Sequence, residues 1–122
     1  MSYVALATER FAETARFYGE TLGFPVLDAW DRPGARGRVF DLGGGLRLEV
    51  LDAARERRPM RLGEPDGRCQ IVIEVEDLDA ALARLAIATP EPVATSWGAR
   101  LIGLRDPDGT AVWFLERSGS PP

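Results

Sequence analysis

Apolar positions in the first part of the chain alternate between the period of a strand and that of a helix. Residues 3–8, YVALAT, are typical of a strand. From Phe11 to Leu22, apolar residues recur at offsets of four, three and four, which is the spacing of one helix face. Gly23 comes next and predicts the end of this helix. Three short β-rich runs then follow, at residues 24–30, 36–42 and 46–52.

The same order of elements returns in the second part. Residues 69–75, CQIVIEV, predict a strand, and Asp77 is a typical N-cap for a helix whose apolar face ends at Leu85. Three more strands are predicted at residues 92–97, 99–105 and 110–116. Between the last two, the order Asp-Pro-Asp-Gly at 106–109 indicates a turn rather than a catalytic pair of carboxylates. The sequence therefore predicts an α+β chain with two tandem βαβββ modules.

The two parts of the chain align with one another. Tyr3 falls on Gln70 at an offset of 67 and Glu49 falls on Trp113 at an offset of 64, so the copies differ by three residues in their loops. One copy alone would expose the apolar face of a small sheet, so two copies must pack or curl together. We predict a single domain over residues 1–122, with module one at 1–52, a charged linker at 53–67 and module two at 68–118.

Composition excludes several classes of function. The formal net charge of −4 argues against binding to the phosphate backbone of nucleic acids. The chain has no histidine, which excludes Ser-His-Asp and Cys-His catalysis and removes the commonest ligand of zinc and iron. The single cysteine, Cys69, lies in an apolar run and is predicted to be buried. No segment predicts a membrane span or a signal peptide, so we expect a cytoplasmic protein.

Three motifs, taken in order, resemble a known family. They are ARFYGETLGF at 15–24, IEVEDLDAAL at 73–82 and RDPDGTAVWFLE at 105–116. They resemble the first helix end, the second strand–helix junction and the closing hairpin of the glyoxalase/bleomycin-resistance protein/extradiol dioxygenase (vicinal oxygen chelate) superfamily. The resemblance implies curled mixed sheets around an open cup, and assembly as a homodimer.

The resemblance also implies four positions for metal ligands in the cup. Carried over by register, these positions are occupied by Tyr3, Glu49, Gln70 and Trp113, where metal-dependent members have histidine, glutamate or glutamine. A neutral tyrosine is a poor ligand, and tryptophan offers only an N–H donor. The two remaining oxygen donors would hold a catalytic divalent ion poorly. We therefore predict that the metal site is lost, as in the metal-free, bleomycin-resistance-like branch, and assign no cofactor and no catalytic residue.

Strand alternation predicts which side chains line the cup. The candidate ligand-binding residues are Tyr3, Arg47, Glu49, Gln70, Glu74 and Trp113. The two rings offer stacking area for a flat ligand, and the two carboxylates attract positive charge. Two alternatives stay open: Trp113 as a filler of a degenerate cup, and Glu49 as the ion-pair partner of Arg47 or Arg100. Trp30 and Trp97 lie near strand ends and fit core packing, the cup rim or a dimer contact.

Three hypotheses for the function remain. The favoured one is a metal-independent protein that binds a small molecule, sequestering an antibiotic or a hydrophobic or cationic metabolite as bleomycin-resistance proteins do. The alternative is a lyase, isomerase or dioxygenase of the same superfamily, with Glu49 or Glu74 as general base, or with Glu49, Gln70 and waters around a metal. The third is an interaction module whose cup is filled by its own side chains.

Overall fold

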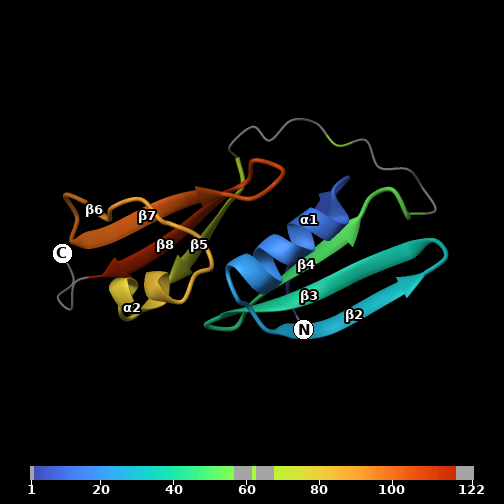
Figure 1. Ribbon diagram of the computed structural model, residues 1–122, viewed down its shortest axis with the longest axis horizontal. Coiled ribbons are helices and arrows are strands. Elements are labelled where there is room, and N and C mark those ends of the chain that lie inside the picture. The colour runs from blue at the N-terminus through green and yellow to red at the C-terminus, as the bar shows by residue number, and fades with distance from the viewer. Residues whose placement is uncertain (1, 57–61, 63–67, 118–122) are drawn as a thin grey trace. The chain divides into compact units, whose positions relative to one another are not determined.

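The computed structural model describes residues 2–56, 62 and 68–117, and the chain divides into two compact units, Met1–Glu64 and Pro65–Pro122 (Figure 1). Each unit has the predicted order of one strand, one helical segment and three strands. The first contains β1 (Val4–Thr8), α1 (Phe11–Arg16), η1 (Phe17–Thr21), β2 (Val26–Arg32), β3 (Ala35–Gly43) and β4 (Leu46–Asp52). The second contains β5 (Gln70–Glu74), α2 (Leu78–Ala83), β6 (Val93–Ala94), β7 (Ala99–Arg105) and β8 (Ala111–Arg117). The predicted α+β class is thus confirmed.

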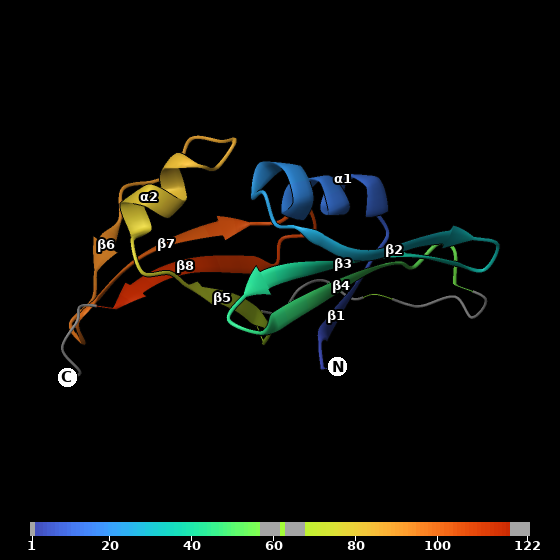
Figure 2. The same ribbon diagram turned by 90° about the horizontal axis from the view of Figure 1, so that it is seen from below.

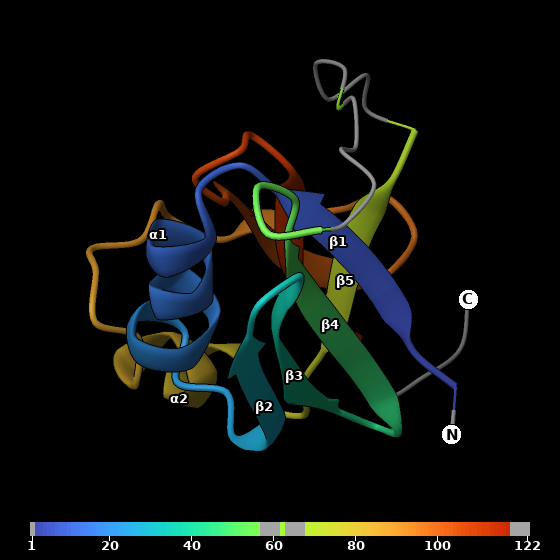
Figure 3. The ribbon, with the colours of Figure 1, turned by 90° about the vertical axis from the view of Figure 1, so that its right-hand side faces the viewer.

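The first unit is a four-stranded mixed sheet with the order β1-β4-β3-β2 and with α1 across one face (Figures 2 and 3). β1 runs parallel to β4, and the other neighbours are antiparallel. Phe40, Leu48 and Val50 lie on the helix side and are almost completely buried, because the apolar face of the helical segment covers them. The rings of Tyr18 and Phe40 lie 6.1 Å apart at this core.

The second unit repeats this topology with the order β5-β8-β7-β6 and with α2 on one face (Figure 2). β5 is parallel to β8, and β7 is antiparallel to both of its neighbours. The core lies between the sheet and α2, and its buried side chains are Ile71, Ile73, Leu78, Ile102, Val112 and Phe114. We call the sheet face away from the helix the open face of each unit.

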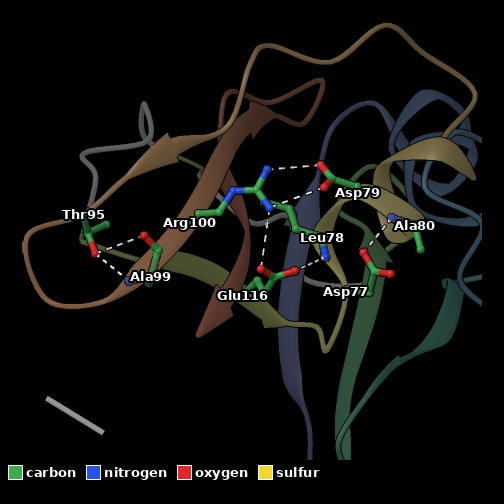
Figure 4. A network of polar contacts seen from close by, with 8 residues as sticks. All are labelled: Asp77, Leu78, Asp79, Ala80, Thr95, Ala99, Arg100 and Glu116. Carbon is green, nitrogen blue, oxygen red and sulfur yellow. Dashed lines mark hydrogen bonds and ion pairs between the residues drawn. The ribbon is translucent and has the colours of Figure 1, made fainter. Parts of the chain in front are cut away.

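A polar network attaches α2 to its sheet (Figure 4). Asp77 is the predicted N-cap, and its carboxylate accepts a hydrogen bond from the Ala80 N–H at 3.1 Å. Glu116 of β8 accepts a 2.6 Å hydrogen bond from the Leu78 N–H, at the first residue of the helix. Arg100 of β7 bridges Glu116 and Asp79. Backbone donors at the helix start are therefore satisfied by side chains of both the helix and the sheet.

The first helix and β6 differ in detail from the sequence-based prediction. The helix continues beyond Arg16 as a π turn, in which the Leu22 N–H donates to the Phe17 carbonyl at 2.8 Å. β6 has two residues rather than the predicted six. The reason lies at Thr95, whose hydroxyl accepts from the Ala99 N–H at 3.0 Å and whose N–H donates to the Ala99 carbonyl, so the chain turns there.

The prediction that Cys69 is buried is wrong, because its side chain is exposed. Cys69 precedes Gln70, the first residue of β5 to pair with β8, so no neighbouring strand covers it. The predicted linker, residues 53–67, lies largely outside the described residues, as does the end of module two at residue 118. Within the described ranges, no helix is long and apolar enough to cross a lipid bilayer.

Candidate functional site

Strand register places the aligned residues of the two modules at equivalent positions. Glu49 lies beside Ala5 of the parallel neighbour β1, and Trp113 lies beside Val72 of the parallel neighbour β5. Ala5 and Val72 each come two residues after the first positions of the alignment, Tyr3 and Gln70. The predicted internal repeat is therefore confirmed at the level of individual strand pairs. Because side chains alternate along a strand, these residues belong to the open face of their own unit.

On the open face of the first unit, Arg47, Glu49 and Leu51 alternate with the buried Leu48 and Val50, as predicted. Desolvation by partial burial, and to a lesser degree the negative charge of Glu56, raises the pKa of Glu49 above its ordinary value. Tyr3 precedes β1 and is half exposed.

The suggested ion pair of Glu49 with Arg47 or Arg100 does not form within the described residues. Arg100 instead pairs with Asp79 and Glu116 on the helix side of the second unit. Arg47 lies opposite Asp41 of β3. Glu49 is therefore a carboxylate that shares the open face with Arg47 without an ion pair between them.

On the open face of the second unit, the Trp113 indole lies against the neighbouring strand at a glycine, where no side chain projects. Gly103 of β7 pairs with Trp113, and a Cβ at Gly103 would come 2.8 Å from Cζ3 of the indole. The indole Nε1–H donates a 2.7 Å hydrogen bond to Oε1 of Gln70 on β5. The ring thus reaches from β7 to β5 across its own strand, and both of its ends are fixed.

A second polar and aromatic group lies on the same open face. Glu74 pairs with Arg117 at 3.0 Å, and the Arg117 guanidinium lies 5.5 Å from the centre of the Trp97 ring. The Trp97 side chain is 43% exposed, so it is not a core residue. Our sequence reasoning placed Glu74 on this face but missed Gly103 and Arg117 as residues that position the rings. The glycine in the middle of a predicted strand was the available signal, because such glycines often mark a close approach.

The donor atoms at the four aligned positions do not suit a divalent metal ion. In the second unit, Trp113 offers no lone pair, which leaves the Gln70 side-chain oxygen as the possible ligand, and one of its lone pairs accepts the indole N–H. In the first unit, the two aligned positions are occupied by Glu49, which offers one carboxylate, and by Tyr3, which is a weak ligand when neutral. No cluster of three or more histidine, cysteine, aspartate or glutamate side chains able to hold a metal occurs in the described part of the chain.

Asp106 and Asp108 form the predicted turn. The buried Asp106 carboxylate accepts 2.9 Å hydrogen bonds from the N–H groups of Asp108 and Thr110. Gly109 closes the turn with a φ of 87°, in the region that favours glycine. The Asp106 carboxylate therefore holds the hairpin together by accepting backbone hydrogen bonds.

Comparison with known proteins places these features in a family. The model of the Glyoxalase/Bleomycin resistance protein/Dioxygenase superfamily matches residues 1–114. A search of curated protein sequences finds no match. Among solved structures, the chain is 25% identical to TnmS3, an antibiotic binding protein from Streptomyces sp. CB03234, with a TM-score of 0.69 over 95% of this chain and 93% of that one.

Two further structures show the same fold. A glyoxalase/bleomycin resistance protein/dioxygenase from Nocardioides is 25% identical, with a TM-score of 0.72 over 99% of this chain and 85% of that one. A lactoylglutathione lyase from Agrobacterium tumefaciens is 19% identical, with a TM-score of 0.66 over 95% of this chain and 92% of that one. The second likeness concerns the fold alone.

Proposed function

The chain belongs to the glyoxalase/bleomycin resistance protein/dioxygenase superfamily, and on that premise we propose that it binds and sequesters a small molecule without a metal ion. The proposed ligand is an antibiotic or another hydrophobic or cationic metabolite. One observation carries the proposal: the Trp113 ring lies against Gly103 and donates its N–H to Gln70. Trp113 and Gln70 occupy two of the positions where metal-dependent members of the family would need ligands. An immobilised ring gives stacking area at little further loss of conformational entropy on binding.

Two carboxylates on the open faces support a ligand with cationic groups. Glu49 on the first unit and Glu74 on the second each contribute a carboxylate. Arg117 neutralises Glu74 and lies over Trp97, so a ligand cation that replaced it would gain both the carboxylate and the ring. The proposed ligand-binding residues are Tyr3, Arg47, Glu49, Gln70, Glu74 and Trp113. TnmS3 supports the ligand class, because that relative is an antibiotic binding protein.

The proposal extends to the organisation of the chain. In it, residues 1–52 and 68–118 are modules of one domain, the residues between them are a linker, and two chains form a homodimer. Light scattering after size-exclusion chromatography measures the mass, and a monomer at all concentrations would exclude the dimer.

The decisive experiment compares ligand binding with folding in two variants that each lose one aromatic ring. Trp113→Ala removes the proposed stacking surface. Phe17→Ala is the matched control, because Phe17 packs edge-on against Tyr18 at 5.2 Å in the helical segment and not on an open face. Doxorubicin, which is flat and carries an amine, and bleomycin serve as probes in fluorescence or calorimetric titrations.

We expect Trp113→Ala to weaken probe binding about tenfold or more, since losing a well-placed aromatic contact and its buried area costs over ~1.4 kcal/mol. Phe17→Ala should lose stability but keep its affinity within about twofold, below ~0.5 kcal/mol. Equal losses of affinity in both variants would show that Trp113 acts through folding alone. Native mass spectrometry of the purified protein, with elemental analysis, reports any bound small molecule or metal directly.

The raised pKa of Glu49 favours one alternative, a lyase, isomerase or dioxygenase in which this carboxylate is a general base. The two functions separate at Glu49→Gln. A binding protein should lose affinity for a cationic ligand in Glu49→Gln and show no turnover in either form. An enzyme should convert the compound identified by mass spectrometry and lose that turnover in Glu49→Gln while still binding it.

A further inference from the structure

A small pocket lies in the first unit on the side of the sheet that carries α1, away from Arg47 and Glu49. Its volume is about 210 Å³, and its lining includes Phe11 at the start of α1 and side chains of β2 and β3. Register explains why these side chains meet: Ala29 lies opposite Arg38 and Asp31 lies opposite Arg36, so all four point to the same face. The pocket belongs entirely to the first unit.

Among the side chains that line this pocket, guanidinium groups outnumber carboxylates. Arg36 lies 4.5 Å above the Phe11 ring and is 3.8 Å from the Asp31 carboxylate. Asp31 is shared, because it also accepts a 2.6 Å charged hydrogen bond from Arg55. The remaining guanidinium, Arg38, lies 5.9 Å from the centre of the Phe11 ring.

Arg38 is half-buried and has no carboxylate within ion-pair distance among residues 2–56, 62 and 68–117. The Asp52 carboxylate lies 4.0 Å from Arg36, and the Asp31 carboxylate pairs with Arg36 and Arg55. Both carboxylates near the pocket therefore pair with arginines other than Arg38. A partly desolvated guanidinium with a fork of N–H donors is well suited to a carboxylate, which it can bind through two parallel hydrogen bonds.

We propose that this pocket binds a small planar carboxylate, with Arg38 holding the anion and with Phe11 and Ala29 forming the apolar wall. The pocket is small: its volume of about 210 Å³ is below the ~300 Å³ at which pockets for drug-sized compounds begin. A single-ring acid therefore fits better than an antibiotic. The site is separate from the open faces, so it does not depend on the function proposed above.

Benzoate is the probe, and benzamide is its neutral analogue of nearly the same shape. Both are titrated into the ¹⁵N-labelled full-length protein and followed by amide chemical shifts. The variant is Arg38→Gln, and the matched control is Arg32→Gln. Arg32 lies on the same hairpin and carries the same charge, but it is two residues from Trp30 on the opposite side of the sheet from Asp31.

We expect benzoate to shift the amides of Phe11, Ala29 and Arg38, and benzamide to bind at least about tenfold more weakly. Arg38→Gln should weaken benzoate about tenfold or more, as loss of a charged hydrogen bond does. Arg32→Gln should change the affinity less than twofold. Arg38→Lys, which keeps the charge but loses the fork, should fall between wild type and Arg38→Gln.

Three results would overturn the proposal. They are equal affinity for benzoate and benzamide in the wild-type protein, equal weakening by Arg38→Gln and Arg32→Gln, and benzoate shifts confined to residues outside the pocket. The first comparison needs no variant, so it stands even where a substitution harms folding. Shifts at Trp113 or Gln70 would instead assign benzoate to the open face of the second unit.

Discussion

Replacing Gly103 by alanine tests how the Trp113 ring is held. In the middle of a strand, alanine in place of glycine normally adds about 0.5–1 kcal/mol of stability, because glycine loses more conformational freedom on folding. At Gly103 the new Cβ would lie 2.8 Å from Cζ3 and 3.1 Å from Cε3 and Cη2 of Trp113. Side chains do not pack that closely, so the indole has to move.

The expected magnitude follows from the contacts that would change. Inserting a methyl group into occupied space costs about 1–3 kcal/mol. Moving the ring also breaks the hydrogen bond from Trp113 to Gln70, which contributes about 1 kcal/mol. After subtraction of the ordinary gain from alanine, Gly103→Ala should lower the free energy of unfolding by about 1–3.5 kcal/mol.

The sign should reverse when the indole is absent. In a Trp113→Ala background there is neither a clash nor a hydrogen bond to lose, so Gly103→Ala should stabilise by about 0.5–1 kcal/mol. Urea denaturation of the four proteins, followed by far-UV circular dichroism, gives the coupling energy of this double-mutant cycle, which we expect to be at least about 1.5 kcal/mol. A neutral Gly103→Ala, or the same change in both backgrounds, would refute the packing of Trp113 against Gly103.

Three further predictions concern titration, the attachment of α2 and the cysteine. Burial raises the pKa of Glu49, so the folded state holds its proton more tightly than the unfolded state, and the free energy of unfolding should fall as pH rises from about 4.5 through the folded-state pKa. Urea denaturation across this pH range should show a smaller fall for Glu49→Gln than for the wild-type protein. An identical dependence on pH in both proteins would contradict the burial of Glu49. Glu116→Ala should lower the free energy of unfolding by about 1–3 kcal/mol, because it leaves the Leu78 N–H without its acceptor. Asp79→Ala, which removes an exposed ion pair, should lower it by less than about 1 kcal/mol. Equal losses of stability in the two variants would argue against the hydrogen bond as the cause. Cys69 is exposed, so the native protein should react with a thiol reagent nearly as fast as the urea-unfolded chain, and strong protection would restore the buried assignment.

Local pattern was sufficient to predict most of the fold. The offsets from Phe11 to Leu22 located the first helical segment, and the predicted strand at 99–105 has the same bounds in the structure. Prediction failed where neighbours decide the outcome. β6 is short because Thr95 turns the chain, and Cys69 is exposed because pairing with β8 begins one residue later.

The candidate site was only partly predictable for a related reason. Period-two alternation assigns a side chain to a face of its own strand, and it placed Trp113 and Gln70 on the same face correctly. It does not report which rotamer a side chain adopts or what lies across the neighbouring strand. The contact of Trp113 with Gly103, and that of Trp97 with Arg117, join residues 10 and 20 positions apart in the chain, and strand pairing brings them together.

The sequence by itself therefore determined the class of fold, the repeat and the absence of histidine. Backbone periodicity and turn residues act locally, and a chain without histidine lacks that ligand in any fold. The tertiary structure alone decided which partners the polar side chains have. Oε1 of Gln70 accepts the Trp113 N–H, whereas Arg38 lines a pocket without a carboxylate partner among the described residues. Hydrogen bonds and ion pairs depend on distances of a few ångströms, and these are fixed only when strands far apart in the chain come into register.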